Sequence, residues 1–336
     1  MKYLLLPFLL VFALVFQNCN TKSRSSSQES KTIIRLSHSH PETFSSELHM
    51  TAWLFKQFVE EFSDELEVKI YGANALGQER EIIEALQIGS GASCYIGGTA
   101  ILNNFIPEMG VLDLPYLWKD YGHIHDALDG EAGKELVRIS SREGLKVLSF
   151  LDSWGYRNIV TASKVIENAE DLKGLKIRTI QAKNYIETIN SMGMNATPMS
   201  FGEVYTGMQT GILDGFEHNA AAIQSAKLYE VAKHLVYTRH LFGAVAFTYS
   251  QKQWDKLTEH QKEAVQKAAQ MASQIERSLA PVKEQEAIDF LVSKGMQIHN
   301  IDIEPFRSSS IALQNRLAEN CNGLAILNAI RSCENQ

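Results

Sequence analysis

No run of lysine and arginine and no basic helix face stands out in this chain, whose 336 residues carry a formal net charge of -7. A protein that binds a phosphate backbone needs such a surface, because it must neutralise several phosphates at once. The composition therefore excludes nucleic acid as the expected partner. Small anionic ligands stay open, since a single cleft can be locally positive.

The sequence also lacks the short motifs of common catalytic and cofactor sites, with no nucleophile elbow, phosphate loop or zinc-protease helix motif. The stretch GSGASC begins like a dinucleotide loop, but Cys94 stands where a third glycine must allow close helix packing. The pairs His38/His40 and His123/His125 have no carboxylate or cysteine at a diagnostic spacing, which favours solvated or hydrogen-bonded histidines over a metal site. We expect no catalytic residue, no metal and no cofactor.

The apolar run near the start, YLLLPFLLVFALVF, is too short to span a bilayer comfortably and is interrupted by Pro7. We interpret residues 1–18 as a secretory signal peptide and Cys19 as a lipidated N-terminus. A Ser-rich flexible tether follows at 19–31. The alternative is an ordinary signal cleaved nearby with loss of Cys19. Both interpretations predict export to the periplasm, the first with a lipid anchor as the sole membrane contact.

Cysteine is scarce, at four residues. Export would place Cys94, Cys321 and Cys333 in a space where disulfides can form. Cys321 and Cys333 are close enough to bridge the C-terminal segment, but their spacing does not establish a disulfide. Cys94 lies in ASCYIGG, which predicts a buried strand with the thiol as a small core side chain.

Strand-like and helix-like patterns alternate from residue 32 onward, and no short repeat is present. The strands are predicted at TIIRLSH, LEVKIYG, LKIRTI and ILDGFEHN, and the helices at SSELHMTAWLFKQFVEEFS, QEREIIEALQIGSG, KNYIETINSMG and AAAIQSAKLYEVAKHL. Ser200 and Glu203 form a capping box at the head of a further helix. This pattern and an apolar content of 45% predict an α/β protein with two sheets and two lobes.

A long amphipathic helix is predicted late in the chain. Its apolar residues recur at spacings of three and four, at Val265, Ala268, Ala272, Ile275 and Leu279. Pro281 should kink or divide this helix.

Several polar side chains fall on loops or strand ends, where open α/β sheets bind ligands. They are Arg178, Arg157, Glu79, His38 to His40 and Asn219. A guanidinium at a rigid strand end can hold a carboxylate by two parallel hydrogen bonds. For Arg178 an ion pair within the protein is the equally weighted alternative. For Asn219 the alternative is turn chemistry, and Phe201 suits either the core or a ligand face.

Five blocks together resemble the TRAP-type (tripartite ATP-independent periplasmic) substrate-binding proteins of the DctP family. They are GLKIRT, NATPMSFGEVYTGMQTGILDG, YGANALGQEREIIEALQIG, VLDLPYLW and LDGEAGKEL. The resemblance implies a two-lobed type II periplasmic binding protein fold with a hinge and a long bracing helix. We expect lobe I at 32–154 plus about 244–283, and lobe II at 155–243 plus about 284–336.

The resemblance also implies roles for single residues. In this family the arginine of the GLKIR block takes the ligand carboxylate, which assigns that role to Arg178. Residues matching Arg157, Phe201 and Glu79 contribute further contacts. The first strand end, here Ser39 and His40 with His38 beside them, commonly contributes too. Many members carry Asn after the glutamate of the DG-x-E block, whereas this chain has His218 there and Asn219 next, so either side chain could contact the ligand.

The function that the resemblance implies is capture of a small organic acid between the lobes and delivery to the small and large membrane subunits of a sodium-driven permease. We favour a sugar acid such as a uronate, because Ser39 and the histidines could hydrogen-bond hydroxyl groups and the GEVYTGMQTGILDG block looks like those of uronate binders. Sialic acids and C4-dicarboxylates stay open. The alternatives are a periplasmic enzyme acting on sugar acids and a sensing module for a signalling receptor.

Overall fold

The computed structural model describes residues 31–333. The predictions for the signal peptide at 1–18, for lipidation at Cys19 and for nearly all of the tether at 19–31 lie outside the described residues. Within 31–333, no helix combines the length and the apolar character that crossing a membrane requires.

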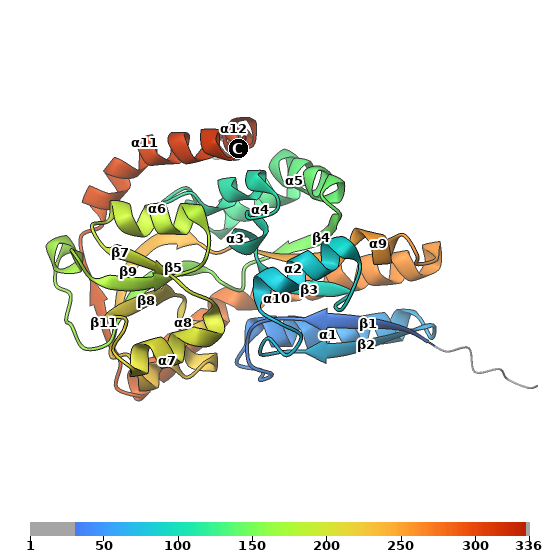
Figure 1. Ribbon diagram of the computed structural model, residues 1–336, viewed down its shortest axis with the longest axis horizontal. Coiled ribbons are helices and arrows are strands. Elements are labelled where there is room, and N and C mark those ends of the chain that lie inside the picture. Colours follow the sequence, from blue (N-terminus) through green and yellow to red (C-terminus); the bar gives the residue numbers. More distant parts are fainter. Residues whose placement is uncertain (1–30, 334–336) are drawn as a thin grey trace, which may run out of the picture. The chain divides into compact units, whose positions relative to one another are not determined.

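The first sheet has five strands in the order β2-β1-β3-β10-β4 (Figure 1). Its strands are β1 (Thr32–Ser37), β2 (Leu66–Tyr71), β3 (Cys94–Gly98), β4 (Leu145–Leu151) and β10 (Val245–Ser250). β1 runs parallel to β2 and β3, whereas β10 runs antiparallel to β3 and β4. Cys94 is fully buried in β3 with a free thiol, which confirms its prediction as a core side chain.

The second sheet has six strands in the order β11-β9-β5-β8-β6-β7. Its strands are β5 (Tyr156–Thr161), β6 (Lys176–Thr179), β7 (Asn195–Pro198), β8 (Gly215–His218), β9 (His234–Phe242) and β11 (Gln297–Asn300). β6 runs parallel to β7 and β8, and β5 runs antiparallel to β8 and β9. The two sheets agree with the predicted pair of lobes, and the chain passes between them from β4 to β5 and from β9 to β10.

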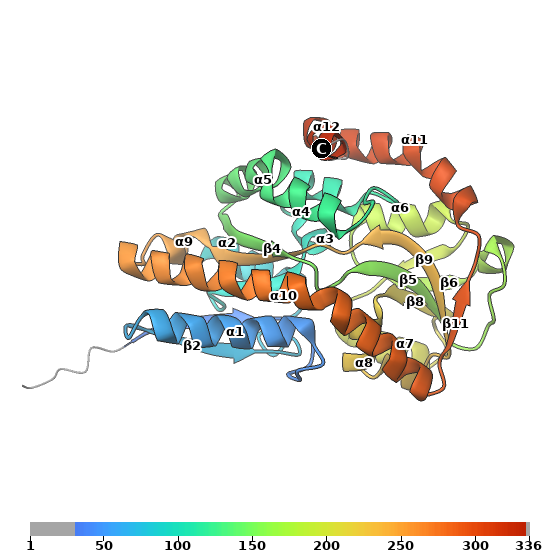
Figure 2. The same ribbon diagram turned by 180° about the vertical axis from the view of Figure 1, so that it is seen from behind.

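Helices cover both sheets (Figures 1 and 2). They are α1 (Glu47–Phe62), α2 (Glu79–Ile88), α3 (Thr99–Leu102), α4 (Tyr121–Asp129), α5 (Glu131–Arg142), α6 (Lys183–Ser191), α7 (Val204–Gln209), α8 (Ala220–Ser225), α9 (Gln251–Trp254), α10 (Glu259–Ser293), α11 (Glu304–Asn320) and α12 (Leu324–Ser332). Short 3-10 turns are η1 (Pro107–Asp113), η2 (Ala169–Leu172), η3 (Phe201–Glu203) and η4 (Leu228–Glu230). The predicted capping box of Ser200 and Glu203 is present at η3, directly before α7.

α10 is the long helix that the spacing of apolar residues predicts. Thr258 caps its first turn, and Val265, Ala268 and Ala272 are fully buried. The helix contacts α1 and β4 beside the first sheet and α8 beside the second. It continues through Pro281, so the proline does not divide it, and Figure 2 shows α10 changing direction along its length.

One predicted helix is much shorter than expected. The stretch AAAIQSAKLYEVAKHL predicts a single helix, but α8 ends at Ser225, Lys227 adopts a left-handed backbone with φ of 55°, and β9 begins at His234. β9 pairs with both β5 and β11. Of the predicted helix only His234 and Leu235 lie in β9, where this long-range strand pairing overrides the local helical preference, while Leu228–Glu230 form η4.

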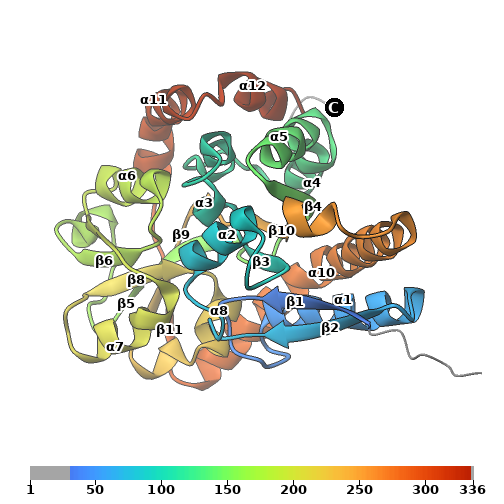
Figure 3. The same ribbon diagram turned by 45° about the vertical axis from the view of Figure 1, so that its right-hand side comes forward.

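The two C-terminal helices pack beside the first sheet. α11 contacts η1, and α12 contacts α5 and η1 (Figure 3). Cys321 and Cys333, in this region, are free thiols.

The first sheet has a large apolar core, in which the fully buried rings of Phe55 and Phe247 lie 4.6 Å apart. We expect Phe247→Ala to lower the free energy of unfolding by about 3–5 kcal/mol, because the truncation removes apolar contacts and leaves a cavity. Phe44 is 57% exposed, so Phe44→Ala should change the free energy of unfolding by no more than about 0.5 kcal/mol. Urea titrations of both variants measure the difference, and equal losses would contradict this account of the core.

Candidate functional site

The site lies where strands from both sheets end. β6 and β8 are parallel neighbours, so their carboxyl ends meet at one edge of the second sheet. Arg178 is the penultimate residue of β6, and His218 is the last residue of β8. Ser39 and His40 follow the end of β1 in the first sheet. The described structure therefore brings predicted residues from distant parts of the sequence together.

Arg178 is 1% exposed and has no carboxylate oxygen within 4.0 Å among residues 31–333. Its Nε and Nη2 atoms both donate to the backbone carbonyl of Met199, at 2.9 and 2.6 Å. Burial lowers the pKa of Arg178 to about 10, although Glu217 opposes the shift. The group stays charged at neutral pH, and the carbonyl orients it without neutralising it. The described residues therefore show no ion pair of the kind that the alternative interpretation of Arg178 requires.

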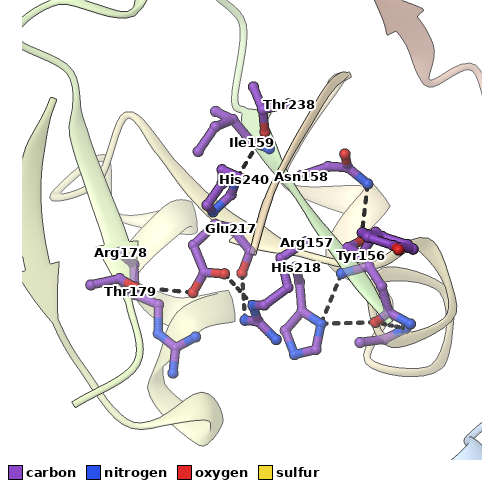
Figure 4. A network of polar contacts seen from close by, with 12 residues as sticks. Tyr156, Arg157, Asn158, Ile159, Arg178, Thr179, Glu217, His218, Thr238 and His240 are labelled. Carbon is purple, nitrogen blue, oxygen red and sulfur yellow. Dashed lines mark hydrogen bonds and ion pairs between the residues drawn. The ribbon is translucent and has the colours of Figure 1, made fainter. Parts of the chain in front are cut away.

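Arg157 lies in a different electrostatic environment. Its Nε atom donates to Oε2 of Glu217, and its Nη2 atom donates to the backbone carbonyl of Glu217 at 3.0 Å. Thr179 donates to the other carboxylate oxygen of Glu217 at 3.1 Å. Burial alone would lower the pKa of Arg157, but Glu217, Tyr185 and Asp113 together outweigh burial and raise it. The pair is therefore neutral as a unit, and Figure 4 shows it between Arg178 and His218.

Aromatic rings from both lobes pack around the guanidinium group of Arg157 and around one another. The ring of His40 stacks on Phe201 at 4.9 Å and lies 5.9 Å from His218 and 6.4 Å from Trp154. The guanidinium carbon of Arg157 lies 5.4 Å from the Trp154 ring and 5.3 Å from the Tyr185 ring. These contacts place Phe201, His40 and His218 around one buried site.

Glu79 begins α2 and is 4% exposed. It accepts a hydrogen bond of 2.8 Å from the hydroxyl of Tyr95. Burial raises the pKa of Glu79, and the hydrogen bond from Tyr95 and the positive charge of Arg178 oppose that rise. Glu79 thus lies near Arg178 without forming an ion pair with it.

His218 and Asn219 differ in how many of their side-chain atoms already form hydrogen bonds within the protein. Asn219 accepts from the backbone N–H of Ala222 to cap α8, and its amide donates to the carbonyl of Ser153 at 3.1 Å. Nδ1 of His218 contacts Asn219, whereas no hydrogen bond within the described residues involves Nε2. The capping role of Asn219 fits the turn chemistry considered for it, and His218 is the side chain that faces the aromatic rings.

His38 points elsewhere. Its Nε2 atom lies 3.3 Å from Nδ1 of His49 on α1, and burial lowers its pKa to about 3. The second histidine pair is also engaged with the protein, since His123 contacts the carbonyl of Ile330 and His125 contacts Asp152. Among residues 31–333 no group of three or more His, Cys, Asp or Glu side chains could hold a metal ion.

Polar atoms without a protein partner gather at the site. The buried ones are Ser39 Oγ, His40 Nε2, Trp154 Nε1, Arg157 Nη1 and Tyr185 OH. A buried polar group without a hydrogen bond is costly, so this set marks a place that a polar molecule can fill. The set contains strong donors and residues that can accept, which suits hydroxyl groups.

Sequence reasoning missed three contributors, Trp154, Tyr185 and the role of Glu217. Trp154 stands directly before Gly155 in the connection between the sheets, where a loop aromatic could have been noticed. Tyr185 lies on α6 among ordinary helix residues, and no local signal distinguishes it. Glu217 is sixty positions from Arg157, so only the antiparallel pairing of β5 with β8 reveals the ion pair.

Two lobes of α/β structure with a buried arginine between them are the arrangement of a solute-binding protein of the periplasmic type. Residues 36–320 match the family model DctP, described as bacterial extracellular solute-binding protein, family 7. The chain belongs to this family, the substrate-binding proteins of TRAP transporters, whose members act outside the cytoplasm. The two-lobed fold predicted from the sequence is thereby confirmed.

Similar proteins with known structures bind sugar acids. A sugar acid binding protein from Advenella mimigardefordensis, in complex with galactonate, superposes with a TM-score of 0.85 and 27% identity, covering 90% of this chain and 99% of that one. A TRAP solute-binding protein from Sulfitobacter with bound β-D-galacturonate gives 0.84 and 27%, covering 90% and 100%. The 2,3-diketo-L-gulonate-binding protein YiaO of Escherichia coli is 31% identical over 74% of this chain and 76% of its own.

Burial lowers the pKa of His40 to about 3, and it also lowers that of His218. An unfolded histidine takes up a proton below about pH 6.5, while the folded chain keeps His40 neutral, so the free energy of unfolding should fall as pH drops from about 6.5 towards 3. In His40→Gln the fall between pH 6 and pH 4 should be shallower, by up to about 1.4 kcal/mol per pH unit.

Urea titrations at several pH values measure this slope. His260→Gln, at an exposed histidine, serves as the control. The change of its free energy of unfolding with pH should be steeper than that of His40→Gln, as it is for the wild type. Parallel slopes for wild type and His40→Gln would show that His40 takes up its proton equally in both states.

Proposed function

We propose that this protein captures a sugar acid with one carboxylate, such as a uronate, between its lobes and delivers it to a sodium-coupled TRAP permease. The observation that carries the proposal is the buried Arg178, which keeps a positive charge without a carboxylate partner in the described residues. A buried charge is costly unless an opposite charge compensates it. A ligand carboxylate supplies that charge and two acceptor oxygens for the fork of Arg178.

The charge balance favours one carboxylate over two. Two guanidinium groups lie at the site, and Glu217 already neutralises one of them through its ion pair with Arg157. His40 and His218 are held neutral by burial. A C4-dicarboxylate would bring a second negative charge for which the site offers no unpaired cation, and its desolvation would weaken binding.

Hydroxyl groups on the ligand match the remaining polar atoms. Ser39, Trp154 and Tyr185 each present a buried polar atom without a partner, and a polyhydroxylated acid can pair with all of them. The similar proteins that bind galactonate, galacturonate and 2,3-diketo-L-gulonate support this ligand class.

The mechanism is capture without chemistry. The open lobes admit the acid, Arg178 and Arg157 engage it, and closure about the hinge removes water and strengthens the charge pairing. Glu79, Phe201, Ser39, His40 and His218 complete the proposed contacts. A lipid anchor at Cys19 holds the protein at the membrane, and the bound acid is passed on unchanged.

Replacing Arg178 tests the central contact. Arg178→Ala should weaken binding of D-galacturonate roughly thirtyfold to several thousandfold, because truncating one partner of a desolvated charge pair costs about 2–5 kcal/mol. Arg178→Lys should also weaken it substantially, since a point charge does not reproduce the planar fork. Isothermal titration calorimetry measures both, with the exposed Arg142→Ala as control. Unchanged affinity in Arg178→Ala would remove the basis of the proposal.

A panel of acids tests the ligand class. D-galacturonate, D-glucuronate, D-galactonate, N-acetylneuraminate, succinate and neutral D-galactose are compared by thermal unfolding, in which a ligand at a hundred times its Kd adds about 2.7 kcal/mol of stability. We expect the sugar acids with one carboxylate to raise the melting temperature, and mass spectrometry to recover them unchanged. A shift with galactose or succinate alone would contradict the proposed class, and a modified acid would indicate an enzyme.

A further inference from the structure

A cavity, called the hinge-side cavity below, lies on the opposite face of β5 from Arg157. Its volume is about 510 Å³, within the range of small-molecule sites. Three parts of the chain line it: residues 116–121 before α4, strands β5 and β9 of the second sheet, and the second half of α10 with the start of α11. Because side chains alternate along a strand, Tyr156 and Asn158 of β5 face this cavity while Arg157 faces the site already described (Figure 4).

The hinge-side cavity is lined by more cationic than anionic side chains. Lys119, Arg239 and Arg307 line it, and none of them forms an ion pair within residues 31–333. The lining also holds two carboxylates, Glu284 and Asp120, and Glu284 interacts electrostatically with Arg239, which opposes the rise in its pKa caused by burial. Glu284 accepts from the backbone N–H groups of Ala220 and Ala221 at 2.9 and 3.1 Å, and Asp120 accepts from the backbone of His123 at 2.9 Å.

Arg239 is held in place by the strand geometry. The pairing of β5 with β9 shifts register at this point, and Arg239 adopts φ of 42°. Asn158 accepts a hydrogen bond of 3.1 Å from the backbone N–H of Arg239. Such bulges re-aim side chains, and strained backbone is maintained where it serves a site. Here the bulge places the guanidinium 5.9 Å from the Tyr156 ring and 5.7 Å from the Tyr237 ring.

Two hydroxyl groups add independent support for a ligand. The hydroxyl oxygens of Tyr116 and Tyr156 are buried and have no hydrogen-bond partner among residues 31–333. Tyr116 also adopts a left-handed backbone, with φ of 54°. A phenolic hydroxyl donates readily to an anionic oxygen, and the aromatic rings around it provide flat apolar surfaces.

We propose that the hinge-side cavity binds a small organic anion that carries a flat unsaturated ring. Arg239 and Arg307 meet the anionic group, the hydroxyls of Tyr116 and Tyr156 donate to it, and the rings of Tyr156, Tyr237 and Trp118 contact its flat part. This ligand and the captured sugar acid bind on opposite faces of β5, so the proposal does not depend on the identity of the sugar acid.

The test uses 1-naphthoate as the probe and isothermal titration calorimetry of the purified protein. We expect one naphthoate per chain, with 1-naphthalenemethanol, which lacks the charge, binding at least tenfold more weakly. Arg239→Gln should weaken naphthoate binding at least tenfold, Arg239→Lys should restore part of it, and Tyr156→Phe should weaken it severalfold. Should Arg239→Gln melt at a much lower temperature than wild type, Arg307→Gln on the exposed start of α11 replaces it.

A matched variant separates the two sites. Arg178→Gln should leave the affinity for naphthoate within about twofold of wild type, while it lowers the affinity for the sugar acid. Naphthoate binding that depends on Arg178 and not on Arg239 would place the probe in the first site and overturn the proposal. Equal affinity for 1-naphthalenemethanol, or no heat with naphthoate, benzoate and 1-naphthyl phosphate at millimolar concentration, would also overturn it.

Discussion

The rest of the site depends on the two hydrogen bonds that hold Arg178 in position against the carbonyl of Met199. A carbonyl fixes the direction of a guanidinium but adds no negative charge, so the group is rigid and still uncompensated. Arg157 shows the contrast, because Glu217 both orients and neutralises it. The protein therefore holds two buried arginines of similar position and different electrostatic state, and of the two only Arg157 has a carboxylate within ion-pair distance among residues 31–333.

The fold explains why that carbonyl is where Arg178 needs it. Met199 follows the end of β7, which pairs in parallel with β6, and the capping box of Ser200 and Glu203 fixes the next turn of the chain. The backbone N–H of Met199 also donates to the carbonyl of Thr179, at 3.1 Å. A local capping motif and a strand pairing thus determine the position of one carbonyl, which in turn determines the position of the buried charge.

Local patterns predicted those parts that depend on neighbouring residues. The end of β6 one residue after Arg178 and the capping box of Ser200 and Glu203 follow from signals within a few positions. The contacts that join distant residues could not be predicted in this way. Glu217 meets Arg157 only through the pairing of β5 with β8. Likewise, β9 takes the last two residues of a predicted helix, because its partner β5 lies far away in the sequence.

α10 links the two lobes through two carboxylates on either side of Pro281, the buried Glu276 and the partly buried Glu284. Glu276 accepts from the backbone N–H of Asp152 and the hydroxyl of Ser153, at the end of the first sheet. Glu284 accepts from the first backbone N–H groups of α8, beside the second sheet. Proline removes one backbone hydrogen bond between these anchors, so bending the helix there costs less than bending it elsewhere in its interior. Each half of the helix therefore stays fixed to its own lobe, and the weakest point of the brace lies between them.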